Sequence, residues 1–193
     1  MLFLGGVKYR WFILGGLAML LGLILILGAG GYEASRITAW QDPFSDPTDD
    51  GYQIIQSLYA IGSGGLFGLG LGNGRQKYLY LPEEHNDYIF SIACEELGLA
   101  GAVGILILYS LLILRGYWIS MHIRDRFLSL TVAGITTLTA LQVFFNIGVV
   151  TNLLPSTGIS LPFFSYGGTA LLIQLGEMGI ILGASRQCSA GFL

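Results

Sequence analysis

The chain has 193 residues, of which 53% are hydrophobic and only 11% are charged, and its mean hydropathy is +0.69. Soluble domains carry roughly a quarter charged residues, so this composition predicts a membrane protein. The net charge of -3 comes without a block of basic residues, which excludes the usual signature of a nucleic-acid partner. Cys94 and Cys188 have neither metal-ligand spacing nor the density of a disulfide scaffold.

Four apolar runs are long enough to be transmembrane helices, at residues 11–32, 88–114, 127–150 and 163–185. A helix needs about 20 mostly apolar residues to cross the hydrocarbon. The first run lacks a small-residue cleavage pattern, so we interpret it as a retained helix. The pattern predicts an all-α polytopic membrane protein with a single membrane domain, residues 1–193, and a large extracytoplasmic loop over residues 33–87.

The basic residues give an orientation, because they are enriched in short cytoplasmic loops. With both termini in the cytoplasm, three basic residues lie outside and six lie inside: Lys8, Arg10, Arg115, Arg124, Arg126 and Arg186. The uncharged run Gly51–Gly74 is not interpreted as a fifth crossing, since its helix-compatible part, Tyr52–Ile61, is too short. A fifth crossing would also place three of the inner arginines outside.

Four ionisable groups precede the second predicted helix in the stretch LPEEHNDYIF, residues 81–90. Asp87 lies where the helix dipole favours a carboxylate, so it is either a helix cap or a general base toward a bound hydroxyl. Glu83, Glu84, His85 and Asp87 also carry donor atoms that suit a divalent cation. Their spacing matches no metal motif, and a solvated acidic turn is the stronger interpretation. No cofactor is assigned.

Three acids lie within or near the predicted hydrocarbon: Glu95, Glu96 and Glu177. Ionisable residues are costly there and are functional candidates by default. They could form a proton or ion pathway. We favour instead a structural hydrogen-bond network with Gln142, Asn146 or Gln174.

Two passages, GLFGLGLGNGRQKYLYLPEEHNDYIFSIACEELGLAG and LLPSTGISLPFFSYGGTALL, resemble the SEDS family (shape, elongation, division and sporulation), the FtsW/RodA/SpoVE group. The shared motifs are G-x-G-x-G-x-x-Q-K, L-P-E-x-H-x-D-[FY]-I-F, E-E-L-G and T-G-x-x-L-P-F-x-S-Y-G-G. The resemblance covers nearly the whole chain. It implies a peptidoglycan glycosyltransferase of cell division, cell shape or sporulation. Such an enzyme polymerises lipid II outside the bacterial cytoplasmic membrane, generally beside a class B penicillin-binding protein.

The resemblance also assigns roles to individual residues. It implies that Asp87 is the catalytic general base, and that Lys77, with Arg75, faces the pyrophosphate of the donor. The implied substrate-binding residues are Arg75, Gln76, Lys77, Glu84, His85, Ser165, Tyr166, Gly167 and Gly168. Two positions depart from the family: Ser160 replaces a common proline, and Leu79 replaces an acid that some relatives carry.

Members of the family have a ten-helix fold, and the helices of this chain match the last four. We therefore expect a fragment, a split gene or a truncated reading frame. Two other functions stay open. A transporter or flippase of a lipid-linked precursor would depend more on Glu95, Glu96 and Glu177 than on Asp87. A non-catalytic remnant would only pack against a partner.

Overall fold

The computed structural model describes residues 8–28, 32–45, 50–74 and 87–189. In these ranges the chain forms helices and connecting turns, and no strand. The elements are α1 (Tyr9–Gly28), α2 (Tyr32–Gln41), η1 (Pro43–Ser45), α3 (Asp50–Gly64), α4 (Ile89–His122), α5 (Arg126–Val150) and α6 (Gly168–Ser189). The all-α class that the sequence predicts is confirmed in this part of the chain.

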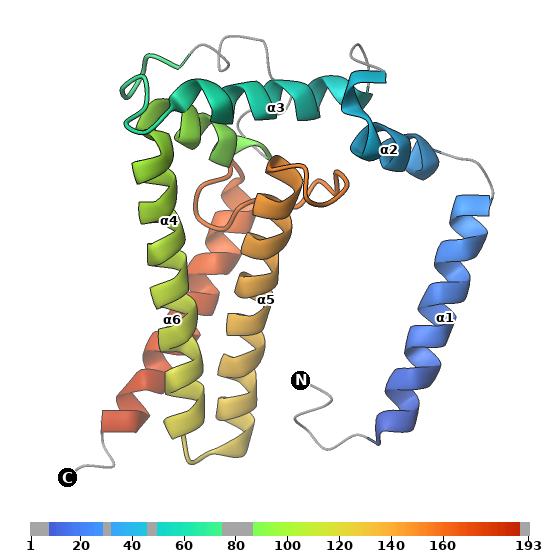
Figure 1. Ribbon diagram of the computed structural model, residues 1–193. Coiled ribbons are helices and arrows are strands. Elements are labelled where there is room, and N and C mark those ends of the chain that lie inside the picture. Colours follow the sequence, from blue (N-terminus) through green and yellow to red (C-terminus); the bar gives the residue numbers. More distant parts are fainter. Residues whose placement is uncertain (1–7, 29–31, 46–49, 75–86, 190–193) are drawn as a thin grey trace.

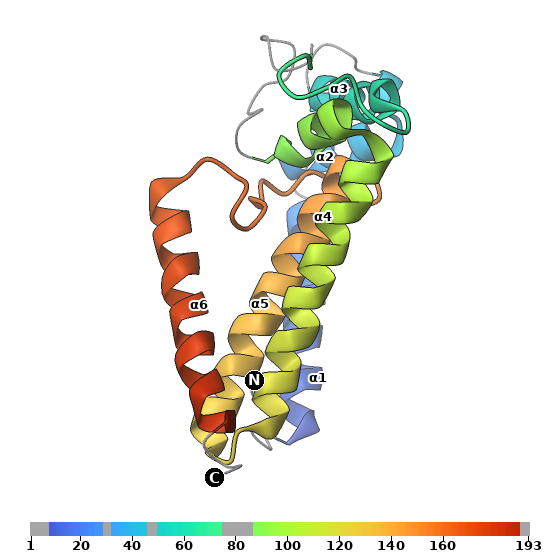
Figure 2. The ribbon, with the colours of Figure 1, turned by 90° about the vertical axis from the view of Figure 1, so that its left-hand side faces the viewer.

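Helices α4 and α5 form an antiparallel pair that α6 joins at one end (Figures 1 and 2). The turn between α4 and α5 is short because Asp125 caps α5, its carboxylate accepting a hydrogen bond from the Phe127 nitrogen at 3.1 Å. At this end the three helices share a buried apolar cluster of Ile119, Ile123, Val132, Ile181 and Ala184. Toward its first turn, α6 diverges from the other two helices (Figure 2).

At the opposite end, α3 lies across the start of α4 and the end of α5 (Figure 1). Its apolar face, with Ile54, Ile55 and Ala60, is buried. The hydroxyl of Ser57 donates to the Val150 carbonyl at 2.8 Å and so fixes α3 to the last turn of α5. The short helix expected over residues 52–61 is therefore present as part of α3.

Helix α2 was not expected, because the sequence placed its residues at the end of the first crossing and in a loop. Its sequence, YEASRITAWQ, has no continuous apolar run that would predict a crossing or a buried helix. The helix is held by side-chain contacts far along the chain. The indole nitrogen of Trp40 donates to the Asn152 carbonyl at 3.1 Å, beyond the end of α5.

Among the described residues, three helices are long and apolar enough to cross a membrane: Ile89–His122, Arg126–Val150 and Gly168–Cys188. Helix α1 is apolar too, but its part with described side chains, Tyr9–Gly22, is shorter than a crossing needs. The crossing over residues 11–32 therefore stays a prediction. In the described part of the chain, α1 packs against α2 and stands apart from α4, α5 and α6 (Figure 1).

The end of α4 and the start of α6 differ most clearly from the predicted crossings over residues 88–114 and 163–185. Helix α4 continues to His122, beyond the predicted end at residue 114, because apolar residues continue past Arg115. Helix α6 begins at Gly168 and not at residue 163. The residues just before it form a turn, in which Phe163 has a positive φ of 64° and so is not helical. The Ser165 hydroxyl also accepts a hydrogen bond from the Leu161 nitrogen at 2.7 Å, which closes a tight turn.

Helix α4 is broken at Gly98, which has φ 68° and ψ -169°. The glycine-rich segment after α3, Gly65–Gly72, supplies the backbone partners that the break removes. Four hydrogen bonds of 2.9 to 3.1 Å join the two: Leu69 N to Glu95 O, Gly70 N to Glu96 O, Leu99 N to Gly65 O, and Ala100 N to Leu66 O. The break thus leaves these backbone groups satisfied, as burial or a membrane requires.

Candidate functional site

Asp87 lies directly before α4, at the end of the molecule that carries α3 (Figure 1). The N-cap position, which the capping interpretation gave to Asp87, belongs to Tyr88, and Tyr88 makes no side-chain cap hydrogen bond. Asp87 is half-buried, whereas Tyr88 is buried. Asp87 therefore has contacts to other elements that a simple helix cap would not need.

The main such contact comes from Asn146 of α5, which is only 1% exposed. Its amide nitrogen donates to the Asp87 carbonyl at 2.7 Å and to the Ile159 carbonyl at 2.8 Å. Both amide hydrogens are used, whereas the amide oxygen Oδ1 is buried and has no hydrogen-bond partner in the described part of the chain. Asn146 thereby joins the residue before α4 to the loop between α5 and α6.

That loop also passes beside the Asp87 carboxylate. Gly158 has a positive φ of 65°, which glycine adopts without strain, and it lies in the segment TGIS. A Cβ added to Gly158 would lie 3.5 Å from Oδ2 of Asp87. The carboxylate therefore faces the backbone of a turn that belongs to the second of the two resembling passages.

Charges of both signs surround Tyr88 at the same place. Burial raises the pKa of Tyr88, the neighbouring Ser156 side chain lowers it, the negative charge of Asp87 raises it further, and the positive charge of Arg36 lowers it. The guanidinium of Arg36, on α2, donates to the Ser156 carbonyl at 3.3 Å. The site therefore combines a carboxylate and a neutral phenol from the segment before α4 with a guanidinium from α2.

Glu95 and Glu96 lie before the break in α4, in the part of the helix that runs beside α3 (Figure 1). Glu95 is 1% exposed. A Cβ on Gly74 would lie 3.0 Å from Oε2 of Glu95 and 3.1 Å from Oε1 of Glu96, so both carboxyl groups approach the chain just before residue 75. Glu95 and Glu96 thus lie at the α3 end of the molecule. The longer part of α4, after the break at Gly98, does not contain them.

The polar partners proposed for these acids have other roles. Asn146 binds two backbone carbonyls, and Oε1 of Gln174 accepts the Phe163 nitrogen at 2.8 Å. Each side chain thus holds a turn in place. Both amides therefore stabilise the loop between α5 and α6 by bonding to its backbone. The sequence had suggested that they bond to the acidic side chains.

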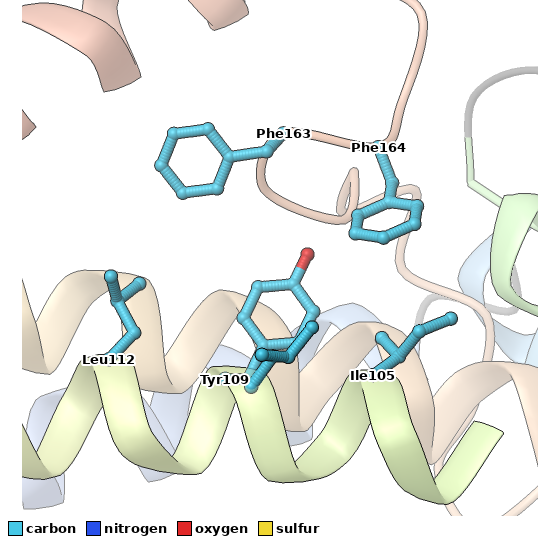
Figure 3. Close-up of a pocket in the computed structure, with 6 residues that line it drawn as sticks. Ile105, Tyr109, Leu112, Phe163 and Phe164 are labelled. Atoms are coloured by element: carbon cyan, nitrogen blue, oxygen red, sulfur yellow. The ribbon is translucent and has the colours of Figure 1, made fainter. Parts of the chain in front are cut away.

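An apolar pocket of 290 Å³ lies between α4 and the turn before α6, lined by Ile105, Leu108, Tyr109, Leu112, Phe163 and Phe164. In Figure 3 the hydroxyl of Tyr109 points toward this turn, and it donates to the Pro162 carbonyl. Four of the predicted substrate-binding residues, Ser165, Tyr166, Gly167 and Gly168, directly follow the two phenylalanines and are not among the residues that line this pocket, so their proposed role stays a prediction. Ser165 closes the turn and Tyr166 is 82% exposed, so the two phenylalanines form the wall.

The remaining predicted substrate-binding residues lie outside the described residues: Arg75, Gln76, Lys77, Glu84 and His85. Glu83 lies there too, so three of the four donors of the alternative cation site are not described. Among the described residues, no group of three His, Cys, Asp or Glu side chains could hold a metal ion. The assignments in residues 75–86 stay predictions.

Sequence reasoning missed the contacts of Asn146 and Gly158 with Asp87. An asparagine inside the apolar run of α5 does signal a buried hydrogen-bond partner. It does not identify that partner, which lies 59 residues earlier in the chain. A glycine between threonine and isoleucine signals a turn, and nothing local connects this turn to an aspartate.

The fold and these contacts define an all-helical membrane protein that holds an aspartate at one end of its long helices. A family model described as "Cell cycle protein", for FtsW, RodA and SpoVE, matches residues 1–190. The chain belongs to this FtsW/RodA/SpoVE family.

Similar proteins agree with this assignment. The chain is 47% identical over 186 residues to stage V sporulation protein E of Bacillus subtilis, covering 96% of this chain and 51% of that protein. It is 45% identical over 187 residues to a probable peptidoglycan glycosyltransferase FtsW of a Geobacter species, covering 97% and 51%. The chain therefore spans about half the length of the curated relatives it matches.

Two solved structures share the fold. One, described as showing structural coordination of polymerization and crosslinking by a peptidoglycan synthase complex, has a TM-score of 0.73 and 30% identity. The match covers 96% of this chain and 51% of the chain in that structure. The other is a mutant of the rod-shape-determining protein RodA of Thermus thermophilus, with a TM-score of 0.53 and 35% identity, covering 67% and 39%.

Proposed function

We propose that this chain is the C-terminal portion of a peptidoglycan glycosyltransferase that polymerises lipid II, with Asp87 as its general base. The observation that carries the proposal is the placement of Asp87. Asn146 holds its backbone, and the turn at Gly158 lies beside its carboxylate. Relatives of the chain named as peptidoglycan glycosyltransferases support the reaction class.

In this reaction the Asp87 carboxylate accepts the proton of the acceptor's sugar hydroxyl while the hydroxyl oxygen attacks the anomeric carbon of the donor. The bond from that carbon to undecaprenyl pyrophosphate breaks, and the lipid pyrophosphate leaves with inversion. Lys77 and Arg75 face the pyrophosphate. A donor and an acceptor that are both anchored in the membrane meet at lower entropic cost than free molecules would.

We infer that both termini are cytoplasmic and that α2, α3 and Asp87 lie outside, where lipid II is presented. The basic residues between α4 and α5, Arg124 and Arg126, support this orientation. A class B penicillin-binding protein is the proposed partner. The resemblance to a complex that coordinates polymerization with crosslinking supports a partner of this kind.

The proposal is tested by Asp87→Asn in the complete protein. Loss of a general base should lower the rate of lipid II polymerisation about 10²- to 10⁴-fold, while membrane insertion is unchanged. Asp125→Asn is the matched control. Asp125 caps α5 at the opposite end, and asparagine caps a helix equally well.

Glycan synthesis at the normal rate by Asp87→Asn would overturn the assignment. The transporter alternative predicts a different pattern, in which purified protein moves lipid II between leaflets without polymerising it. In that case replacing Glu95, Glu96 or Glu177 should reduce movement more than replacing Asp87.

A further inference from the structure

The glycine-rich segment Gly65–Gly72, here called the glycine loop, exposes apolar side chains that nothing in the proposed reaction uses. Phe67 is 85% exposed and Leu71 is 77% exposed, and Leu66 and Leu69 are exposed as well. The chain carries no charged residue from Gly51 to Gly74. Such a concentration of large apolar side chains at a surface marks contact with lipid or with a protein.

The glycine loop is held firmly at one level of α4. Four backbone hydrogen bonds join it to the break in α4, and the two backbones approach so closely that side chains cannot fit between them. A Cβ on Gly68 would lie 2.1 Å from the Glu96 carbonyl oxygen, and one on Gly98 would lie 2.3 Å from the Gly68 nitrogen. The level of the loop along the helix is therefore set by the fold.

Below the break, α4 has an exposed apolar stripe: Leu99, Val103, Ile107, Leu111, Leu114 and Trp118. The buried residues of the same helix, among them Ala102, Ile105 and Tyr109, lie on the other side of it. The stripe thus faces away from α5 and α6. In a helix with the length and hydropathy of a membrane span, such an exposed apolar surface suits contact with lipid.

The far end of the stripe has the residues of a membrane interface. The Arg115 guanidinium lies 4.3 Å from the Trp118 ring centroid, and His122 stacks on Trp118 at 4.2 Å. Tryptophan and basic residues are enriched at the level of the headgroups. From Trp118 back to Leu99 is 19 residues, or about 28 Å of helix, which nearly equals a hydrocarbon core of about 30 Å.

With Trp118 at one interface, Leu99 and the break lie at the other. We propose that the glycine loop is an interfacial membrane anchor, in which Leu66, Phe67, Leu69 and Leu71 enter the boundary between headgroups and acyl chains beside the start of the long part of α4. Figure 1 shows the segment after α3 overhanging the side of α4 that faces away from α5. The loop adjoins the start of the stripe, because the Leu66 carbonyl accepts a hydrogen bond from the Ala100 nitrogen, next to Leu99. The anchor fixes the height of α3 and of Asp87 above the bilayer.

The depth of the loop can be measured with single nitroxide labels on the complete protein in phospholipid vesicles, with Cys94 and Cys188 replaced. The test label is at Phe67→Cys. Ile107→Cys, in the middle of the stripe, is the control in hydrocarbon, and Gln41→Cys, exposed at the end of α2, is the control outside. Relaxation by oxygen, which concentrates in lipid, is compared with relaxation by a water-soluble nickel complex.

The oxygen-to-nickel ratio at position 67 should be several-fold above that at position 41 and below that at position 107. A ratio equal to that at position 41 would place the loop in water and overturn the proposal. A label inaccessible to both reagents would mean that protein covers the loop, which overturns it too. If the cysteine-free background does not fold, Phe67→Trp in the natural background should show added fluorescence that brominated lipids quench. Added fluorescence that they do not quench would overturn the proposal.

Discussion

At the scale of single residues, Asn146 is the side chain on which the geometry around Asp87 depends. It is buried in α5. Its amide nitrogen donates to the Asp87 carbonyl, before α4, and to the Ile159 carbonyl, in the loop between α5 and α6. A side chain that only donates to backbone can take no part in proton transfer. We therefore regard Asn146 as a positioning residue, whose removal should affect the reaction through Asp87.

Asn146→Asp should strongly lower the rate of lipid II polymerisation, while the expression level of the protein stays normal. An ionised carboxylate has no hydrogen to donate, so it leaves two buried carbonyls without their donor, at about 1–3 kcal/mol each. The measurement is the polymerisation rate at saturating lipid II, together with the thermal unfolding temperature.

Thr136→Val is a suitable comparison for Asn146→Asp. It removes one buried hydrogen bond of α5, from the Thr136 hydroxyl to the Val132 carbonyl at 2.8 Å, without touching Asp87 or its loop. It should reduce stability and leave the rate nearly unchanged. Equal losses of rate in the two variants would contradict a positioning role for Asn146.

At the scale of elements, the break in α4 is built from glycines that have different tasks. Gly68 and Gly98 combine a positive φ with an approach to another backbone that excludes a Cβ. Gly62, in α3, has nothing within 4 Å of an added Cβ. The exchange of hydrogen bonds between α4 and the glycine loop therefore requires glycine at Gly68 and Gly98, whereas Gly62 is replaceable.

Gly68→Ala should destabilise the protein, by roughly 1–3 kcal/mol for the backbone strain and by more for the contact with the Glu96 carbonyl. Gly62→Ala should be neutral or stabilising by up to about 1 kcal/mol, because alanine is the better helix former. Thermal unfolding of the two purified variants in one detergent compares them directly. If both melt at the same temperature, the break in α4 does not depend on the close approach at Gly68.

At the scale of the whole molecule, the polar elements gather at one end. Helices α2 and α3, Asp87 and the loop between α5 and α6 all lie at the end opposite the turn between α4 and α5 (Figure 1). Links across this end are long in sequence, such as Arg36 to Ser156 and Ser57 to Val150. They allow two short helices to act as a fixed cover over the ends of α4 and α5.

The proposed orientation predicts which end a membrane-impermeant maleimide reaches. Gln41→Cys should be labelled on intact spheroplasts, and Arg124→Cys only after the membrane is opened; both positions are exposed. Cys94 is buried and contributes little background. Labelling of Arg124→Cys on intact spheroplasts would reverse the orientation and would move Asp87 to the cytoplasmic side.

The sequence by itself determined the membrane class, the approximate positions of α4, α5 and α6, the short helix in the large loop, and the motif that singles out Asp87. These follow from local properties, since hydrophobic length and residue order can be read along the chain. The proposed roles in residues 75–86 rest on the sequence alone.

Only the tertiary structure decided which groups meet. Asn146 binds Asp87 and not the glutamates, α4 is broken at Gly98, and Phe163 and Phe164 line an apolar pocket with Tyr109. A buried amide or an interrupted helix must find a hydrogen-bond partner, but the requirement specifies no particular partner. That choice depends on which distant backbone groups the packed helices bring within about 3 Å.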